Sequence, residues 1–294
     1  MKIYLLLSLI FGTAATLLAS SDAKVLVYTP QLQKISQADT RIAIETILYK
    51  IAEEADFDSV KIEYSDQLSH AVSQYTQGVY EALHMNSLAL MSMFPELKTQ
   101  TAQYWNFSKV KGKRLRNFYI LVRNDTNISS LSSLHNRPIA LTHLDSMQAL
   151  FLDHMMLKIN HSSFENFCGN VIYNTKDATS ILNLFFNKVD MAVVTQHSYN
   201  TAIELNPQLQ KKLTILYRSE TIYPAPSITL VGKKNSYFQQ IFQQYSQDLV
   251  SNTFGRQLMM IYQSVDDINL TEQELERLYE HYQDYMKLKH RYEP

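Results

Sequence analysis

Short apolar runs of strand length alternate with segments of helical periodicity along almost the whole chain, and this alternation is what most constrains the fold. Strands are predicted, among others, at KVLVYTP (24–30), NFYILVR (117–123) and VDMAVVT (189–195). Helices are predicted, among others, at TRIAIETILYKIAEEA (40–55), SMQALFLDHMMLKI (146–159) and KDATSILNLFFNK (176–188). Strands that alternate with helices in this way predict α/β layers built on mostly parallel sheets.

The pattern restarts after the strand at 117–123, which predicts two lobes. We assign 24–124 together with 226–294 to the first lobe, and 125–225 to the second. The 294 residues are enough for two such units, and the segment after 226 is too short for a third domain. The chain therefore crosses between the lobes twice, near 123–126 and near 225–230.

The last 24 residues predict a separate amphipathic helix. Thr271-x-x-Glu274 is a capping-box pattern, apolar residues follow at helical spacing, and basic residues crowd the end. Two interpretations stay open at this point. The helix either packs on the first lobe or docks on a partner.

The first 21 residues have the pattern of a secretory signal peptide. Lys2 precedes an apolar stretch that is short for a membrane span, and small residues follow it. The alternative is an uncleaved anchor. The pattern predicts an exported, soluble protein.

Composition and motifs argue against several classes of function. The net charge is −1, so no general basic field attracts nucleic acid. Cys168 is the one cysteine, so an intramolecular disulfide is impossible. The nine histidines are scattered without metal-ligand spacing, and we find no nucleophile motif, phosphate loop or dinucleotide fingerprint. We therefore expect no enzymatic activity, no metal and no cofactor.

Four stretches in the expected order resemble one known family, the phosphate/phosphonate-type periplasmic substrate-binding proteins of ABC transporters. They are GKRLRNFYILVR (112–123), SLSSLHNRPIALTHLDSMQALFLDHMML (130–157), ATSILNLFFNKVDMAVV (178–194) and LYRSETIYPAPSITLV (216–231). The resemblance spans about 24–264. It implies a two-lobed fold of the type II periplasmic-binding-protein kind, hinge-linked, with a ligand between the lobes.

The resemblance implies that the protein binds a small oxyanion, phosphate- or phosphonate-like, and delivers it to an inner-membrane permease. The chain departs from the family pattern at several positions. Asn136 and Asn187 stand where glycines are usual, and both tolerate the left-handed conformation. Arg116 and Phe118 replace a tyrosine and a serine, and the helix start rich in Ser, Thr and Gly becomes Ser146-Met147-Gln148-Ala149.

Two junctions between a strand and a helix are candidate anion seats, because a helix N-terminus carries unpaired amides and a partial positive charge. In the second lobe the candidates are Thr142, Asp145, Ser146 and Gln148; in the first they are Asn86 and Ser87. The alternative is that Asp145 or Ser146 only caps its helix. We expect the two seats to face each other across the gap between the lobes.

Six further residues complete the candidate ligand set. They are Tyr28 and Thr29 at the end of the first strand, Arg116 as a bidentate clamp, Thr175 and Lys176 before a helix, and Thr195 at a strand end. Three of them have a structural alternative. Tyr28 fits a core position, Arg116 fits a basic surface, and Lys176 fits a solvated first turn.

A second function remains open on the same fold. The second-lobe seat has lost hydroxyls and a glycine relative to the family pattern, and the C-terminal helix is capped. Both features also suit a periplasmic signalling module that docks on a membrane sensor protein.

Overall fold

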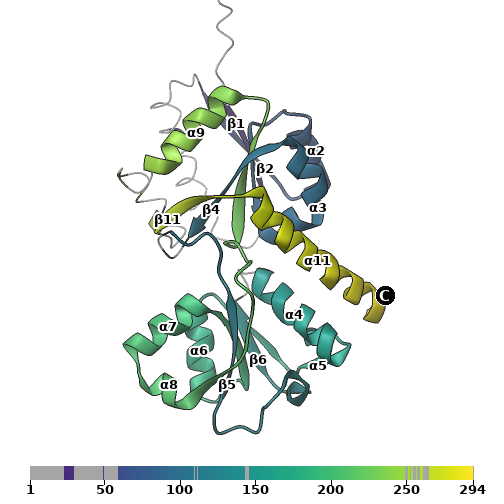
Figure 1. Ribbon diagram of the computed structural model, residues 1–294, viewed down its shortest axis with the longest axis vertical. Helices are drawn as coiled ribbons and strands as arrows, with labels where there is room; N and C mark the ends of the chain where they lie inside the picture. Colours follow the sequence, from purple (N-terminus) through teal and green to yellow (C-terminus); the bar gives the residue numbers. More distant parts are fainter. Residues whose placement is uncertain are drawn as a thin grey trace, which may run out of the picture.

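The computed structural model describes residues 23–29, 49, 59–108, 110, 112–142, 146–248, 251, 253, 256, 259–260 and 265–293. The predicted leader, almost all of the predicted helix at 40–55, and the predicted site residue Asp145 lie outside these residues. The described chain forms two α/β lobes, one above the other in Figure 1, so the predicted two-lobed fold is confirmed. Within these residues no helix is both long and apolar enough to cross a membrane.

The first lobe is built on a six-stranded sheet in the order β11-β4-β10-β3-β1-β2. The strands β1 and β2, and β1 and β3, pair in parallel, whereas β10 and β11 pair antiparallel to their neighbours. The bounds are β1 (Ala23–Tyr28), β2 (Val60–Ser65), β3 (Ala82–Asn86), β4 (Thr101–Ser108), β10 (Ser227–Gly232) and β11 (Asp266–Leu270).

The second lobe is built on a five-stranded sheet in the order β7-β6-β8-β5-β9. Its three central strands are buried along their whole length, as expected for apolar runs covered on both faces. The bounds are β5 (Phe118–Arg123), β6 (Ile139–Thr142), β7 (Val171–Asn174), β8 (Met191–Thr195) and β9 (Leu213–Arg218).

Both sheets are mixed, which corrects the prediction of mostly parallel sheets. In the second sheet β6 pairs in parallel with β7 and β8, but β5 pairs antiparallel with β8 and β9. The reason lies in the crossings. The strands β3 and β8 run toward the junction of the lobes, where Asn86 pairs with Ser227 and Thr195 with Phe118. A strand that enters its sheet from the junction, as β5 and β10 do, must run the opposite way.

Helices cover both faces of each sheet. In the first lobe α2 and α3 lie on one face and α9 on the other; in the second, α4 and α5 lie opposite α6, α7 and α8 (Figure 1). The bounds are α2 (Leu68–Thr76), α3 (Ser87–Gln100), the 3-10 helix η1 (Leu131–Leu134), α4 (Ser146–Asn160), α5 (Phe164–Phe167), α6 (Asp177–Phe185), α7 (Gln196–Leu205), α8 (Gln208–Lys212), α9 (Ser236–Asp248) and α11 (Glu272–Tyr292).

As predicted, asparagine takes the place of glycine at two positions with positive φ. Asn136 has φ 57° and Asn187 has φ 59°, so both adopt the left-handed conformation. Asn187 follows α6, where such a residue ends a helix.

The two crossings lie side by side. The first falls between Ser108 and Phe118 and the second between Arg218 and Ser227, and Arg116 and Tyr223 form an isolated antiparallel bridge between them. The strand β5 lies in the second sheet, so the first crossing precedes that strand, whereas the sequence placed it after the strand.

One apolar core runs through both lobes. It contains Leu90 and Phe94 from α3, Phe151 from α4, and Leu275 and Leu278 from α11. Aromatic contacts continue it through the crossings, with ring centroids 4.8 Å apart for Phe118 and Tyr223, and 6.0 Å apart for Phe118 and Phe151. The lobes are therefore packed against each other along this side.

The helix α11 connects the lobes. Its capping box is present, with the Thr271 side chain accepting from the Glu274 amide and the Glu274 carboxylate accepting from the Thr271 amide. It contacts α3 in the first lobe and α4 in the second. The interpretation that it packs on the first lobe is thus incomplete, because its C-terminal half lies along the second lobe (Figure 1).

The shared core gives a stability prediction. Leu278 is fully buried, so Leu278→Ala should lower the free energy of unfolding by about 2–5 kcal/mol, through lost burial and the cavity that remains. Glu280→Ala, at an exposed position on the same helix, is the control and should change it little. Urea denaturation measures both. Equal small losses would show that α11 does not contribute to the core.

Candidate functional site

Two helices begin at or shortly after the ends of strands that run toward the junction of the lobes. Asn86 ends β3 and Ser87 opens α3; Thr142 ends β6, and α4 begins at Ser146. The two helices contact each other. In α/β sheets, ligands bind outside the carboxyl ends of the strands, and here those ends from both lobes meet. This region between the lobes is the candidate site.

In the first lobe the two predicted residues have structural partners. The Asn86 side chain accepts a hydrogen bond from the Ala89 amide (2.8 Å) and so caps α3. The fully buried Ser87 hydroxyl donates to the Ala225 carbonyl (2.5 Å), and its amide donates to the Pro226 carbonyl (3.0 Å). Ser87 therefore ties the start of α3 to the second crossing.

In the second lobe the predicted residues converge on a carboxylate that the sequence did not single out. Thr142, Gln148 and Thr195 all donate to the side chain of Asp177, the first residue of α6. The Thr195 amide donates to it as well, at 2.9 Å. The structure thus brings together three of the predicted ligand residues, but around an internal anion.

The electrostatics of Asp177 follow from these contacts. Burial alone would raise the pKa of its carboxyl group. The hydrogen bonds from Thr142, Gln148 and Thr195 favour the charged form more strongly, so the pKa lies below its ordinary value. Asp177 is therefore an anion at neutral pH.

Arg116 and Phe118 lie at the crossings. The Arg116 Nε–H donates to the Pro224 carbonyl (2.7 Å), its amide donates to the Tyr223 carbonyl (2.8 Å), and its guanidinium lies 5.3 Å from the centroid of the Phe118 ring. These contacts join the two crossings. They place Arg116 at the hinge rather than on the basic surface named as its alternative.

The other predicted residues are more dispersed. The partly buried Tyr28 ring packs against the shared core. Burial raises the pKa of the Tyr28 hydroxyl, and the nearby Asp66 carboxylate raises it further. The Thr29 amide donates to the Ser65 carbonyl. Thr175 and Lys176 are exposed, just before α6. The backbone of Ser146 opens α4.

A polar cluster joins the lobes beside this region. The Nδ1 of His154 on α4 lies 2.8 Å from the Nε2 of His281 on α11, and the Nε2 of His154 lies 2.9 Å from the Asp284 carboxylate. The Tyr223 hydroxyl lies 3.1 Å from the same His281 nitrogen. With both rings neutral, His154 donates to Asp284 and accepts from His281. The cluster links α4, α11 and the second crossing.

The end of α11 adds further contacts between the lobes. The buried Asp153 of α4 accepts from the Tyr285 hydroxyl (3.0 Å) and the Lys289 ammonium (2.9 Å). Glu293 accepts from the Ser163 amide (2.8 Å) and the Asn166 side chain (2.9 Å). These pairs hold the C-terminal part of α11 to the second lobe.

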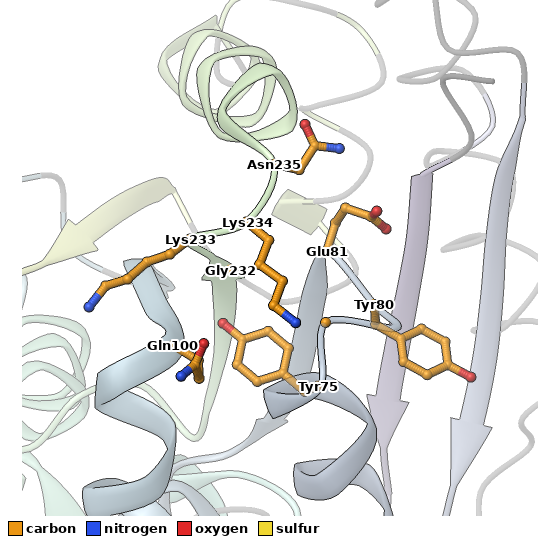
Figure 2. Close-up of a pocket in the computed structure, with 9 residues that line it drawn as sticks. Tyr75, Tyr80, Glu81, Gln100, Gly232, Lys233, Lys234 and Asn235 are labelled. Atoms are coloured by element: carbon orange, nitrogen blue, oxygen red, sulfur yellow. The ribbon is translucent and has the colours of Figure 1, made fainter. Parts of the chain in front are cut away.

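The first lobe also has a shallow hollow, whose lining residues are shown in Figure 2. It is near Glu81 and Gly232, at the opposite ends of β3 and β10 from Asn86 and Ser227. Its two lysines already cap helices. Lys234 donates to the Gln77 carbonyl after α2, and Lys233 donates to carbonyls at the end of α3. We therefore assign this hollow a structural role.

Among the residues that the structure describes, no three His, Cys, Asp or Glu side chains form a group that could hold a metal ion.

The architecture is that of a two-lobed binding protein. Two crossings join the two α/β lobes, and strand ends and helix starts from both lobes meet between them.

Comparison with known proteins identifies the family. Residues 32–241 match the family described as "ABC transporter, phosphonate, periplasmic substrate-binding protein". This is more than half of the chain, and the protein belongs to this family. No curated protein is similar enough in sequence to count as a relative.

Solved structures share the fold. XAC2383 from Xanthomonas citri, bound to chloride ion, has a TM-score of 0.60 at 14% identity, covering 92% of this chain and 100% of its own. PhnD1 from Prochlorococcus marinus, in complex with methylphosphonate, has a TM-score of 0.56 at 10% identity, covering 91% and 99%. A binding protein component of an ABC phosphonate transporter from Pseudomonas aeruginosa has a TM-score of 0.54 at 10% identity, covering 91% and 87%.

The histidine cluster predicts a pH dependence. Burial, with the neighbouring His154 and Lys158, lowers the pKa of His281 to about 4, and burial also lowers the pKa of His154. The unfolded chain binds these protons near pH 6.5. Stability from the cluster is therefore complete above about pH 6.5 and falls as the pH drops toward 4.

Thermal unfolding between pH 4 and 7.5 checks this prediction. His281→Gln should flatten the decline, leaving the parts that come from His154 and from His84, whose pKa burial lowers to about 4. His197→Gln, on the exposed surface of α7, is the control and should keep the wild-type slope. An unchanged slope in His281→Gln would contradict the assignment.

Proposed function

We propose that the protein is an exported solute-binding protein that takes a small anionic solute between its lobes and presents it to an inner-membrane transporter permease. One observation carries this proposal. The helices α3 and α4 each begin at the carboxyl end of a strand, they belong to different lobes, and they contact each other. Two helix N-termini directed at one region favour an anion there without Lys or Arg.

The anion is proposed to be an oxyanion of the phosphate or phosphonate type. The family description names phosphonate, and a structure with the same fold holds methylphosphonate. Another with this fold holds chloride, which supports an anionic ligand without fixing its shape. The departures at Ser146-Met147-Gln148-Ala149 leave fewer hydroxyls than the family pattern, so affinity should depend on few direct contacts.

A ligand panel tests the proposal. Phosphate, methylphosphonate, an alkylsulfonate and a carboxylate are each added to the wild-type protein. A ligand that binds only the folded state at about 100 times its dissociation constant stabilises that state by about 2.7 kcal/mol. We therefore expect a clear rise in melting temperature with at least one anion, and saturation in titration calorimetry. A panel in which no anion shifts the melting temperature beyond a chloride control contradicts the proposal.

A second candidate function is a signalling module that docks on a membrane sensor protein. The observation that favours it is α11, which contacts both lobes, and whose C-terminal end is held to the second lobe by the pair of Lys289 with Asp153 and by the Glu293 carboxylate, which accepts from Ser163 and Asn166. A protein whose lobes are already joined presents a fixed surface to a partner before any solute binds.

Small-angle scattering separates the two functions. Solute delivery predicts a smaller radius of gyration with a saturating anion; the signalling candidate predicts no change. Lys289→Ala should increase the radius of gyration if α11 holds the lobes together, because the variant loses the ion pair that joins α11 to Asp153 of α4. Lys287→Ala, at an exposed position of α11, is the matched control. Identical radii of gyration for the two variants would contradict the idea that α11 holds the lobes together.

A further inference from the structure

The carboxylate of Asp177 occupies a site that has the form of an oxyanion seat. Its Oδ1 accepts from Thr142 Oγ1 (2.7 Å) and Gln148 Nε2 (2.8 Å), and its Oδ2 accepts from the Thr195 amide (2.9 Å) and Thr195 Oγ1 (2.7 Å). Each oxygen thus has two donors. The donors come from the ends of β6 and β8 and the first turn of α4, so three separate elements converge on one anion.

The donors are buried and held in place. Gln148 is 1% exposed, Thr195 7% and Thr142 8%. The Gln148 Oε1 accepts from the Thr142 amide (3.0 Å), which fixes the side-chain amide with its NH₂ toward Asp177. The Thr195 hydroxyl accepts from the Ser198 amide (3.2 Å), which caps α7. Their orientation therefore depends on these contacts as well as on the carboxylate.

The charge of Asp177 is balanced by neutral donors. Among the described residues, no Lys or Arg forms an ion pair with it. A carboxylate that only caps a helix accepts from the amides of that helix. Asp177 opens α6, yet the four donors around it belong to other elements. This pattern is that of a bound anion.

We propose that the second lobe has an oxyanion seat formed by Thr142, Gln148 and Thr195, which the protein fills with its own Asp177 carboxylate. The inference rests on the proposed function for the class of solute and deepens it. In the wild-type protein Asp177 excludes an external oxyanion from this seat, because two anions cannot share four donors and would repel each other. Asp177 is thus a specificity-determining residue.

Chemical rescue tests the proposal. Asp177→Ala removes the carboxylate and leaves the four donors around a space of about its size. Formate, acetate and inorganic phosphate are added to the full-length variant, and melting temperature and titration calorimetry are recorded. We expect Asp177→Ala to be less stable than wild type, and to regain melting temperature in a saturable way with formate. We also expect it to bind formate more tightly than wild type by about tenfold or more.

Two controls make the rescue specific. Asp177→Asn keeps a side chain in the seat, so it should be destabilised without responding to formate. Asp125→Ala removes an exposed lobe II carboxylate that pairs with Arg123, and it should respond to formate no more than wild type. If Asp177→Ala does not fold without added anion, its refolding yield with and without formate becomes the measurement. Formate should raise the refolding yield of Asp177→Ala but not that of Asp177→Asn.

The result that overturns the inference is an Asp177→Ala protein whose stability or refolding is insensitive to all three anions. That failure is distinct from failure of the proposed function. The proposed function fails when the wild-type protein binds no anion of the panel, whatever the variant does. Rescue of Asp177→Ala without binding by wild type would establish a self-occupied seat in a protein that carries no solute.

Discussion

The apolar packing of α11 against both α3 and α4 is the interaction on which the rest of the structure depends. Leu275 and Leu278 are fully buried in the shared core, and the ring centroids of Phe94 and Tyr279 lie 5.4 Å apart. Apolar burial of this kind is the main favourable term in folding, and it has no direction of its own. The polar pairs at His154 and Asp153 supply direction, because an unpaired buried polar group would be costly. Packing holds the lobes together, and the polar pairs set how α11 lies on α4.

The same rule accounts for the candidate site. The polar side chains of Ser87, Thr142, Gln148 and Thr195 are buried, so each needs a partner inside the protein. Ser87 has the carbonyls of the second crossing, and Thr142, Gln148 and Thr195 have Asp177. A solute that bound to these groups would have to replace partners of good geometry. If the proposed seats bind a solute, the free energy of binding would therefore be a difference between two sets of hydrogen bonds.

Local patterns in the sequence were sufficient for the fold class and for several details. The apolar run at Phe118–Arg123 is a fully buried strand, Thr271 and Glu274 form the capping box, and Asn136 and Asn187 are left-handed. Strand direction was not predictable from such patterns, because β5 and β10 are antiparallel owing to where the chain enters each sheet. The partners of Asp177 are 18, 29 and 35 residues away, and no local spacing relates them. The sequence indicated only that Asp177 lies at the start of a helix. An acidic side chain at that position normally interacts favourably with the helix dipole and predicts nothing more.

These features change how solute binding and conformation are coupled. In a hinged binding protein, a solute shifts the lobes toward each other by its differential affinity for the closed state. Here part of that free energy comes from α11, which contacts both lobes through protein groups alone. Asp177 acts in the same direction, since it satisfies the second lobe without a ligand. The contribution left to a solute is correspondingly small. The relative arrangement of the two lobes therefore depends on α11 as well as on any solute that binds between them.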